Sequence, residues 1–450
     1  MSAMKYYYLW TSGCQMNVAD SRRVASALET LNYHPTDRAE GADVVVLNTC
    51  VVRQSAEDSA VGRINSLMGI KRQNPELVIN VMGCLVGVKS YHQLVERFPH
   101  VDVFSPPSDP GPLMAYLTQE KTKAWQQEAT SRRFAFMDGE LELPAADRGQ
   151  LVSAYIPVVL GCSHACTYCI IPYRRGVERS RPVDDVLQEV RSLVDQGVKE
   201  ITLLGQIVDR YGLDLPEPSS LAALLSRVHQ VEGLARIRFL TSHPNWFSEE
   251  LMDTVARLPK VMPHIEVPHQ AGDDQVLKAM KREYTVASYR ELIENIRDRI
   301  PDVSIATDVI VGFPGETREQ FQRSYQLLEA MRFDVVHLAR YSVRPGTVAA
   351  RRMEDKVSEQ EKWRRFKLME ELQEGIAGEI NSRYQGQIVE VLFEGLHKNR
   401  WRGRTPNNKL VFVESERDLR GSILPVSITW TGPWSMQGSV GEKIRMEPHA

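Results

Sequence analysis

The chain has 450 residues, of which 42% are hydrophobic and 25% are charged, and its 55 Lys and Arg residues nearly balance 58 Asp and Glu residues. This composition excludes a disordered or collagen-like chain. At roughly 100–200 residues per domain, the length predicts two to four domains, each able to bury its own core. The net charge of -3 gives no support for RNA or membrane binding, so either affinity would need a local concentration of charge.

The beginning of the chain lacks the basic flank and apolar run of a secretory signal. The apolar runs are far shorter than the roughly 18 residues that span a bilayer. We therefore expect a cytoplasmic protein without a membrane segment. Six cysteines are too few for a disulfide scaffold, and clustered thiols in a reducing compartment are better interpreted as metal ligands or redox groups.

Strand-like and helical runs alternate from residue 5 to about residue 117, which is typical of a doubly wound α/β domain. A cysteine follows each of three strand candidates at 6–10, 44–47 and 78–82, and these are Cys14, Cys50 and Cys84. Parallel strands end at one shared edge, so we expect the three thiols to converge there. The alternative is three unconnected cysteines that pack as small hydrophobic side chains.

Residues 121–149 are charged and poor in long apolar runs, and they are predicted to form a linker. The next strand candidate, 154–160, leads into a C-x3-C-x2-C triplet of Cys162, Cys166 and Cys169. Thiolates suit an iron–sulfur cluster or zinc. A structural zinc needs four ligands, and His164 would reach it only with strain from inside the three-residue spacer. Three ligands suit a four-iron cluster with one open iron; structural zinc and core thiols remain the alternatives.

Strand candidates at 200–204, 236–240, 304–311 and 335–339 alternate with helical segments. Repeated βα units with right-handed crossovers predict a partial barrel whose site lies at the carboxyl ends of the strands. A long amphipathic helix is predicted over 355–384, where apolar residues recur at three- and four-residue spacing, and we expect it to pack against this barrel.

Short alternating strands separated by Gly, Pro and Asn turns predict a small β-barrel over residues 385–450. Residues 379–450 hold ten Lys and Arg and eight Asp and Glu, so the charge is locally basic. A basic loop in this region contains an aromatic residue and no acidic one: Lys398, Arg400, Trp401, Arg402, Arg404 and Lys409. Such a loop can neutralise phosphates and stack on a base, and a solvated hairpin is the alternative.

Over nearly its whole length the chain resembles the radical S-adenosylmethionine (SAM) methylthiotransferases, in particular the branch that acts on isopentenylated adenosine in tRNA. The Cys triplet is the most specific part of the match. The other matching segments are 13–17, 48–50, 83–84, 169–176, 203–206, 241–244, 308–317 and 344–347. The resemblance implies a methylthiotransferase domain over 4–120, a radical SAM domain over 150–384 and a TRAM RNA-binding barrel over 385–450.

The resemblance also implies two 4Fe-4S clusters and SAM as cofactors. Cys162, Cys166 and Cys169 would hold the cluster whose open iron binds SAM, and Cys14, Cys50 and Cys84 the cluster that carries sulfur. The implied reaction places a methylthio group on carbon 2 of isopentenylated adenosine at position 37, beside the anticodon. Candidate SAM contacts, each of which could equally be a structural hydrogen-bonding group, are Tyr168, Gln206 and Ser242.

The implied partners are the anticodon stem-loop of tRNA and an electron donor such as flavodoxin or ferredoxin, and a monomer is expected. Two sister branches share the chemistry but act on threonylcarbamoyl-adenosine in tRNA or on an aspartate of a small-subunit ribosomal protein. Leu204-Gly205-Gln206 favours the isopentenyl branch, and the basic C-terminal barrel disfavours the ribosomal one. A non-catalytic RNA-binding protein with a structural metal is the third alternative, and it predicts zinc.

Overall fold

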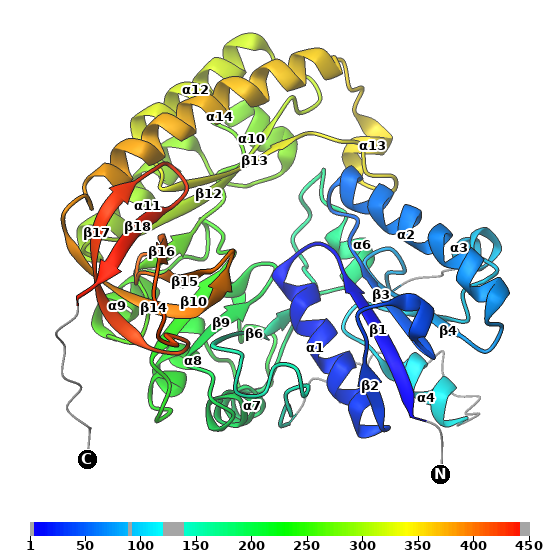
Figure 1. Cartoon of the computed structure of the whole chain (residues 1–450). Coiled ribbons are helices and arrows are strands. Elements are labelled where there is room, and N and C mark those ends of the chain that lie inside the picture. The colour runs from blue at the N-terminus through cyan, green and yellow to red at the C-terminus, as the bar shows by residue number, and fades with distance from the viewer. Residues whose placement is uncertain (1–3, 89–91, 120–138, 442–450) are drawn as a thin grey trace.

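A computed structural model describes residues 4–88, 92–119 and 139–441 of the chain. Most of the predicted linker, residues 121–138, and the last nine residues of the predicted C-terminal domain lie outside the described residues. The predicted mixed α/β architecture is confirmed: an N-terminal α/β unit and a small C-terminal β-barrel flank a central partial barrel (Figure 1). None of the described helices is long and apolar enough to cross a bilayer.

The N-terminal unit is a parallel five-stranded sheet in the order β2-β1-β3-β4-β5. Its strands are β1 Lys5–Thr11, β2 Tyr33–Pro35, β3 Val44–Thr49, β4 Val78–Gly83 and β5 Val103–Ser105. Its helices are α1 Gln15–Thr30, α2 Gln54–Gln73, α3 His92–Arg97 and α4 Gly111–Thr118. Val44 and Val46 of β3 pack in one core with α1, and Val45 and Leu47 pack in another with α2. Helices therefore cover both faces of the sheet, because successive strand residues point to opposite sides.

The central unit consists of two parallel three-stranded sheets, β6-β9-β10 and β11-β12-β13. An isolated bridge between Ile237 and Val261 joins the first sheet to the segment that enters the second. The strands are β6 Ser153–Pro157, β9 Glu200–Leu204, β10 Arg236–Leu240, β11 His264–Glu266, β12 Ser304–Val311 and β13 Val335–Arg340. The helices are α6 Ile171–Arg175, α7 Val183–Asp195, α8 Leu221–His229, α9 Glu249–Arg257, α10 Asp274–Met280, α11 Val286–Arg299, α12 Arg318–Met331, α13 Val348–Arg352 and α14 Glu359–Ser382.

The strand expected over 154–160 is divided into two. β6 ends at Pro157, and β7 Val159–Leu160 pairs antiparallel with β8 Arg179–Ser180. The pairing with β9 ends just past Pro157, where the Val158 N–H donates to the O of Leu204 (2.8 Å), the last residue of β9. The change of direction carries the chain out of the barrel into the loop that holds the Cys triplet.

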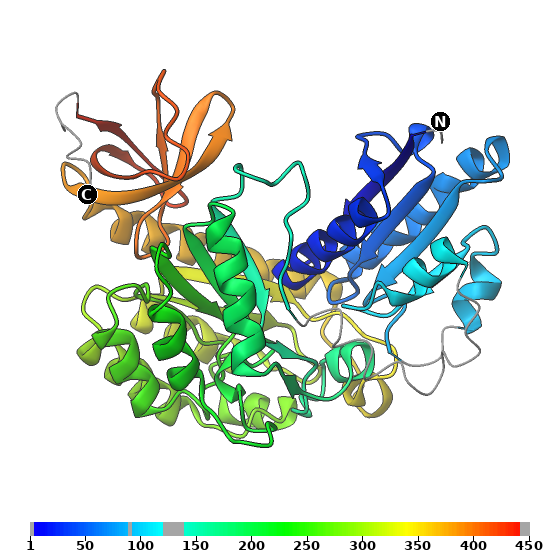
Figure 2. The ribbon, with the colours of Figure 1, turned by 90° about the horizontal axis from the view of Figure 1, so that it is seen from below.

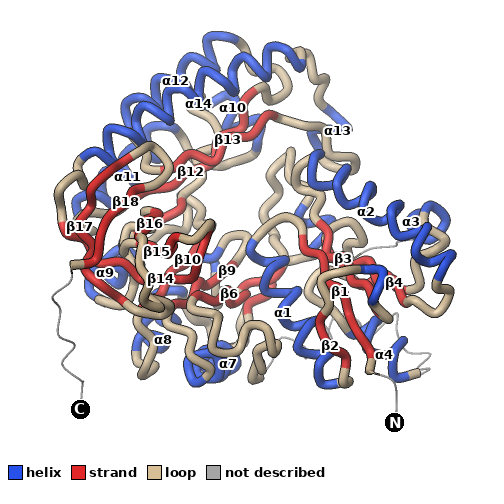
Figure 3. Tube along the Cα trace, viewed as in Figure 1, coloured by secondary structure: helices blue, strands red, loops and turns tan. Residues whose placement is uncertain are grey.

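The predicted long helix is α14, somewhat shorter than the 355–384 range. It contacts β13 and α12, and Figure 3 shows it along the outer side of the strands β12 and β13. Met369 and Ile376 are buried on its inner face. The expectation that this helix packs against the barrel is confirmed.

The C-terminal unit is a closed five-stranded barrel in the order β14-β15-β16-β18-β17. The strands are β14 Ile388–His397, β15 Arg400–Arg404, β16 Leu410–Val413, β17 Ile423–Thr431 and β18 Met436–Val440. Figure 2 shows this barrel beside the central unit, and polar contacts join the two. Arg238 on β10 donates to the carbonyl oxygens of Thr405 (2.9 Å) and Pro406 (2.8 Å), and Ser304 at the start of β12 donates to Asn407 O (2.7 Å). The β15–β16 turn therefore closes the amino-terminal end of the partial barrel.

Candidate functional site

Cys14, Cys50 and Cys84 follow three strands that are neighbours in the sheet, β1, β3 and β4. A Cβ added at Gly13, which has φ +104°, would lie 2.3 Å from Cys50 Cβ and 2.8 Å from its Sγ. The loop of Cys14 therefore approaches Cys50 as closely as only glycine permits. Burial raises the pKa of the Cys50 thiol to about 11, with smaller contributions from nearby Cys84 and Cys14, and burial also raises the pKa of Cys84.

The amide of Asn17 ties the three cysteine loops together. Asn17 is fully buried in the first turn of α1, and its Nδ2 donates to Ser12 O (2.7 Å) and to Thr49 O (3.1 Å). Thr49 O also accepts from the backbone N–H of Cys84 (2.9 Å). The residues before Cys14 and Cys50 and the Cys84 backbone are thus fixed against one another.

Cys162, Cys166 and Cys169 are wrapped in one loop between β7 and α6. Backbone N–H groups of His164 and Ile171 donate to the side chains of Cys162 and Cys169. Burial raises the pKa of Cys162 to about 11 and of Cys169 to about 12, and neighbouring Cys166 adds to both shifts. Buried thiols of this kind bind metal as thiolates, so cluster binding would release their protons.

Cys166 differs because two basic side chains face its sulfur. His164 Nδ1 lies 3.1 Å from Cys166 Sγ, and Arg282 Nη1 donates to the same sulfur over 3.4 Å. Burial disfavours the thiolate, but these two contacts outweigh it and lower the pKa of Cys166. His164 is therefore a hydrogen-bonding neighbour of the triplet. Arg282 lies 116 residues away along the chain, and no spacing in the sequence indicates it.

The two thiol sets border the same end of the partial barrel. Cys14 and Leu240, the last residue of β10, both pack against the cluster of Met16, Leu160 and Leu204, whose two leucines end β7 and β9. Ile170, directly after Cys169, packs in the core that contains Cys84. Both sets thus lie at the carboxyl ends of the strands, where the sequence predicted the site.

The donor chemistry of both sets fits iron–sulfur clusters: each offers three free, largely buried thiols. Among the described residues, no three His, Cys, Asp or Glu side chains lie close enough to hold a single metal ion. A four-iron cluster does not need such closeness, because its thiolates bind different irons.

Comparison with protein families identifies three regions. The radical SAM superfamily matches residues 156–328, an uncharacterized family designated UPF0004 matches residues 6–105, and the TRAM domain matches residues 382–440.

Curated relatives match almost the entire chain. A tRNA-2-methylthio-N(6)-dimethylallyladenosine synthase of Herpetosiphon aurantiacus is 48% identical over 97% of this chain and 98% of its own length. The protein of the same name from a Roseiflexus species is 48% identical over 96% of this chain and 89% of its own length. The chain belongs to the radical SAM methylthiotransferase family.

A solved structure supports the fold of this family member. The radical SAM methyltransferase TsrM of Kitasatospora setae, solved with cobalamin and a [4Fe-4S] cluster, superposes with a TM-score of 0.59 over 80% of this chain and 78% of that chain. Its sequence identity is 16%, so this likeness concerns the fold alone.

The three candidate SAM contacts of this methylthiotransferase lie beside the Cys triplet or at the ends of strands. Tyr168 packs edge-on against Phe313, with ring centroids 6.3 Å apart. Ser242 is 2% exposed, and its hydroxyl finds no hydrogen-bond partner among the described residues. A bound ligand would satisfy this buried hydroxyl. Gln206 is half-buried just after β9.

The predicted basic loop is in large part the strand β15, so its side chains alternate between two faces. Arg402 is exposed, Arg400 and Arg404 are half-buried, and Trp401 between them points into the barrel core with 4% exposure. Trp401 Nε1 donates to Ser415 O (3.3 Å). A base cannot stack on this buried ring. The period-two alternation of Arg residues was the sequence signal for a strand.

Lys409 is also withdrawn from the surface, because it is 8% exposed and pairs with Asp334. Lys398 is exposed in the β14–β15 turn. Arg402 and Arg404 share the carboxylate of Glu394, at 3.1 and 3.3 Å. Exposed aromatic rings occur elsewhere on the barrel, at Trp430 (48%) and Trp434 (56%), and neither was predicted from the sequence.

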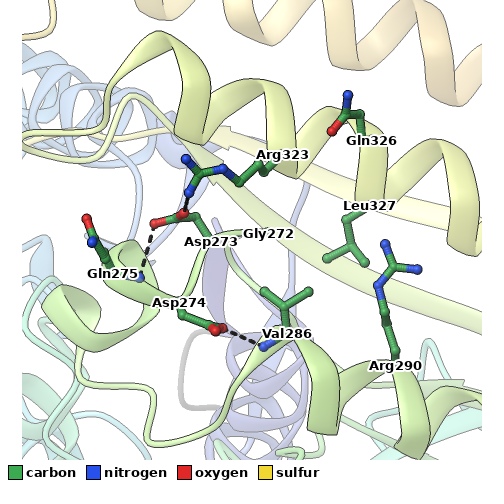
Figure 4. A pocket seen from close by; sticks show the side chains of 9 residues that line it. All are labelled: Gly272, Asp273, Asp274, Gln275, Val286, Arg290, Arg323, Gln326 and Leu327. Carbon is green, nitrogen blue, oxygen red and sulfur yellow. Dashed lines mark hydrogen bonds and ion pairs between the residues drawn. The ribbon is translucent and has the colours of Figure 1, made fainter.

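Two cavities accompany these sites. A cavity of about 420 Å³ lies between the central strands and the C-terminal barrel, and its lining includes Gln15, Arg238, Glu266 and Trp434. Gln15, which directly follows Cys14, borders this cavity, but none of the six cysteines lines it. The other cavity, of about 460 Å³, lies at α10, α11 and α12, where Arg323 pairs with Asp273 (Figure 4), and no cysteine lines it.

Proposed function

We propose that this chain is a tRNA methylthiotransferase that places a methylthio group on carbon 2 of isopentenylated adenosine at position 37, next to the anticodon. The observation that carries the proposal is the near full-length identity to synthases of that name, combined with two sets of three thiols at one end of the partial barrel. The names of these relatives favour the isopentenyl substrate over the two sister substrates.

The cofactors are two 4Fe-4S clusters and SAM. We assign Cys162, Cys166 and Cys169 to the SAM-binding cluster, and Cys14, Cys50 and Cys84 to the second cluster. When bound, the first cluster supplies the electron that cleaves SAM, and the second supplies the sulfur. The chain's own contribution is to bury the thiols and to place His164 Nδ1 and Arg282 Nη1 within hydrogen-bonding distance of Cys166 Sγ.

The proposed domains are 4–120 for the second cluster, 150–384 for the radical SAM chemistry and 385–450 for RNA, with the linker 121–149 between the first two. Tyr168, Gln206 and Ser242 are proposed to contact SAM. Lys398, Arg400, Arg402 and Arg404 are proposed to bind phosphates of the anticodon stem-loop, since their side chains are at least partly accessible. We further propose a cytoplasmic monomer that accepts electrons from flavodoxin or ferredoxin.

Nucleoside mass spectrometry tests this function. tRNA from cells that lack the gene should contain isopentenyladenosine without the methylthio group, and the gene should restore it. Genes that encode Cys14→Ala or Cys162→Ala should not restore it. Persistence of the methylthio nucleoside in the deletion strain would refute the assignment of isopentenylated adenosine as the substrate. Anaerobically purified protein should contain about eight irons per chain, and zinc in their place would indicate a structural-metal protein.

A further inference from the structure

Arg175 reaches from the central domain into the second thiol set. It ends α6, the short helix that begins two residues after Cys169, and it is 1% exposed. Its guanidinium hydrogen-bonds the Cys84 side chain and lies near Cys14 as well. The short helix α6 therefore connects Cys169 of the Cys triplet to Arg175, whose charge lies against the second thiol set.

The same guanidinium is held by the residues that tie the cysteine loops together. Arg175 Nη2 donates to Asn17 Oδ1 (2.7 Å) and lies 3.6 Å from Asp20 Oδ2, and Nη1 donates to Ser108 Oγ (3.4 Å). Asn17 and Asp20 are both buried on the first two turns of α1. The planar fork of arginine suits such simultaneous contacts better than the ammonium of lysine.

A buried cation next to three thiolates has a predictable effect. A thiolate cluster carries negative charge, and one-electron reduction adds more. A fixed positive charge in a poorly hydrated site stabilises the reduced form, because electrostatic interactions are strong where water is excluded. Net charge and hydrogen bonds to sulfur are among the factors that set cluster potentials.

We propose that Arg175 is a positioning residue for the second cluster: it holds the Cys84 thiolate and raises the reduction potential of the cluster by its charge. This inference rests on the proposed assignment of Cys14, Cys50 and Cys84 as ligands. It means that the second cluster site is completed by a residue of the radical SAM domain, so that neither domain alone contains the whole site.

Another arginine provides a matched control. Arg344 also crosses from the central domain, is 4% exposed, and donates to Val51 O (3.2 Å), next to Cys50. Its charge is paired with Glu57 at 3.1 Å. Its removal would weaken the domain contact to a similar extent while leaving the contact with Cys84 intact.

The test uses the full chain with Cys162, Cys166 and Cys169 replaced by Ala, so that only the second cluster is observed. This reference protein is compared with versions that also carry Arg175→Met, Arg175→Lys or Arg344→Met. Iron and sulfide content and the redox titration of the cluster, followed by electron paramagnetic resonance, are measured. At the reference midpoint, Arg175→Met should lower the ratio of reduced to oxidised cluster at least about tenfold, which is about 59 mV for one electron. Arg175→Lys should lower it less, and Arg344→Met should leave it unchanged.

An unchanged midpoint in Arg175→Met at full iron content would overturn the role of Arg175. Equal iron loss in Arg175→Met and Arg344→Met would also overturn it, since this would indicate general weakening of the domain contact. Iron loss in Arg175→Met alone supports the role. If the reference protein holds no iron, the proposed ligand set itself fails, and the inference fails with it.

Discussion

The ammonium of Lys409 lies 2.6 Å from Asp334 Oδ1, and this pair joins the C-terminal barrel to the residue that precedes β13. Both side chains are largely buried, with 8% and 13% exposure. Lys409→Met should destabilise the docked barrel by about 3–5 kcal/mol, because Asp334 would keep a buried charge without its partner. Hydrogen exchange of β15 and β16 measures this loss. Lys398→Met, at an exposed position, should change the free energy of opening obtained from hydrogen exchange by less than about 0.5 kcal/mol. Equal effects of the two substitutions would contradict the stabilising role of the Lys409–Asp334 pair.

The exposed part of the basic strand is expected to bind RNA through phosphates. Replacement of Lys398, Arg400 and Arg402 by Ala should weaken binding of an anticodon stem-loop regardless of its sequence. It should also reduce the salt dependence of the affinity by up to about 0.7–0.9 in the log–log slope for each phosphate that is no longer neutralised. Fluorescence anisotropy at several salt concentrations provides the slopes. Arg417, exposed elsewhere on the barrel, is the control position, and an unchanged slope in the triple variant would refute this surface.

Gly13→Ala should disrupt the second cluster selectively. The added Cβ would lie within 2.3 Å of Cys50 Cβ, so the two loops must separate and the thiols with them. We expect iron content to fall from about eight to about four per chain, while the cluster held by the Cys triplet is retained. The control is Gly62→Ala on α2, where a Cβ meets nothing within 4 Å. Full iron content in Gly13→Ala would show that the loops do not need this close approach.

The carboxyl group of Asp209 should make stability depend on pH. Burial raises its pKa from the ordinary 3.8 to about 7, although its carboxylate accepts from the His243 N–H (2.9 Å). Between about pH 4 and 7 the folded state keeps a proton that the unfolded state has released. The contribution of this protonation to the free energy of unfolding is therefore fully present below about pH 4. It is lost as the pH rises to 7, by up to about 1.4 kcal/mol per pH unit.

Asp209→Asn removes this titration while its amide oxygen can still accept from His243. The apparent thermal midpoint of the variant should rise relative to that of the unchanged protein as pH increases from 5 to 7, and the difference should then become constant. A difference that does not vary with pH would contradict the raised pKa of Asp209.

The order and spacing of the six cysteines predicted the chemistry of the site, because ligand spacing in a loop is a local property of the chain. Cys162, Cys166 and Cys169 share one loop, and Cys14 and Cys50 follow strands whose hydrophobic pattern is continuous. Strand ends in a parallel sheet meet at one edge, so convergence of the N-terminal thiols followed from the same local information.

The contacts between distant segments were decided only by the tertiary structure. Arg175 and Arg282 reach sulfur atoms 91 and 116 residues away, and no periodicity in the chain encodes such pairs. In the sequence, nothing distinguishes Trp401 and Lys409 from exposed residues of the same basic segment. Closure of the barrel nevertheless buries Trp401, and docking of the barrel on the central domain buries Lys409. Charge pattern states which side chains could bind a phosphate, whereas burial, which depends on every packed element, determines which of them remain accessible.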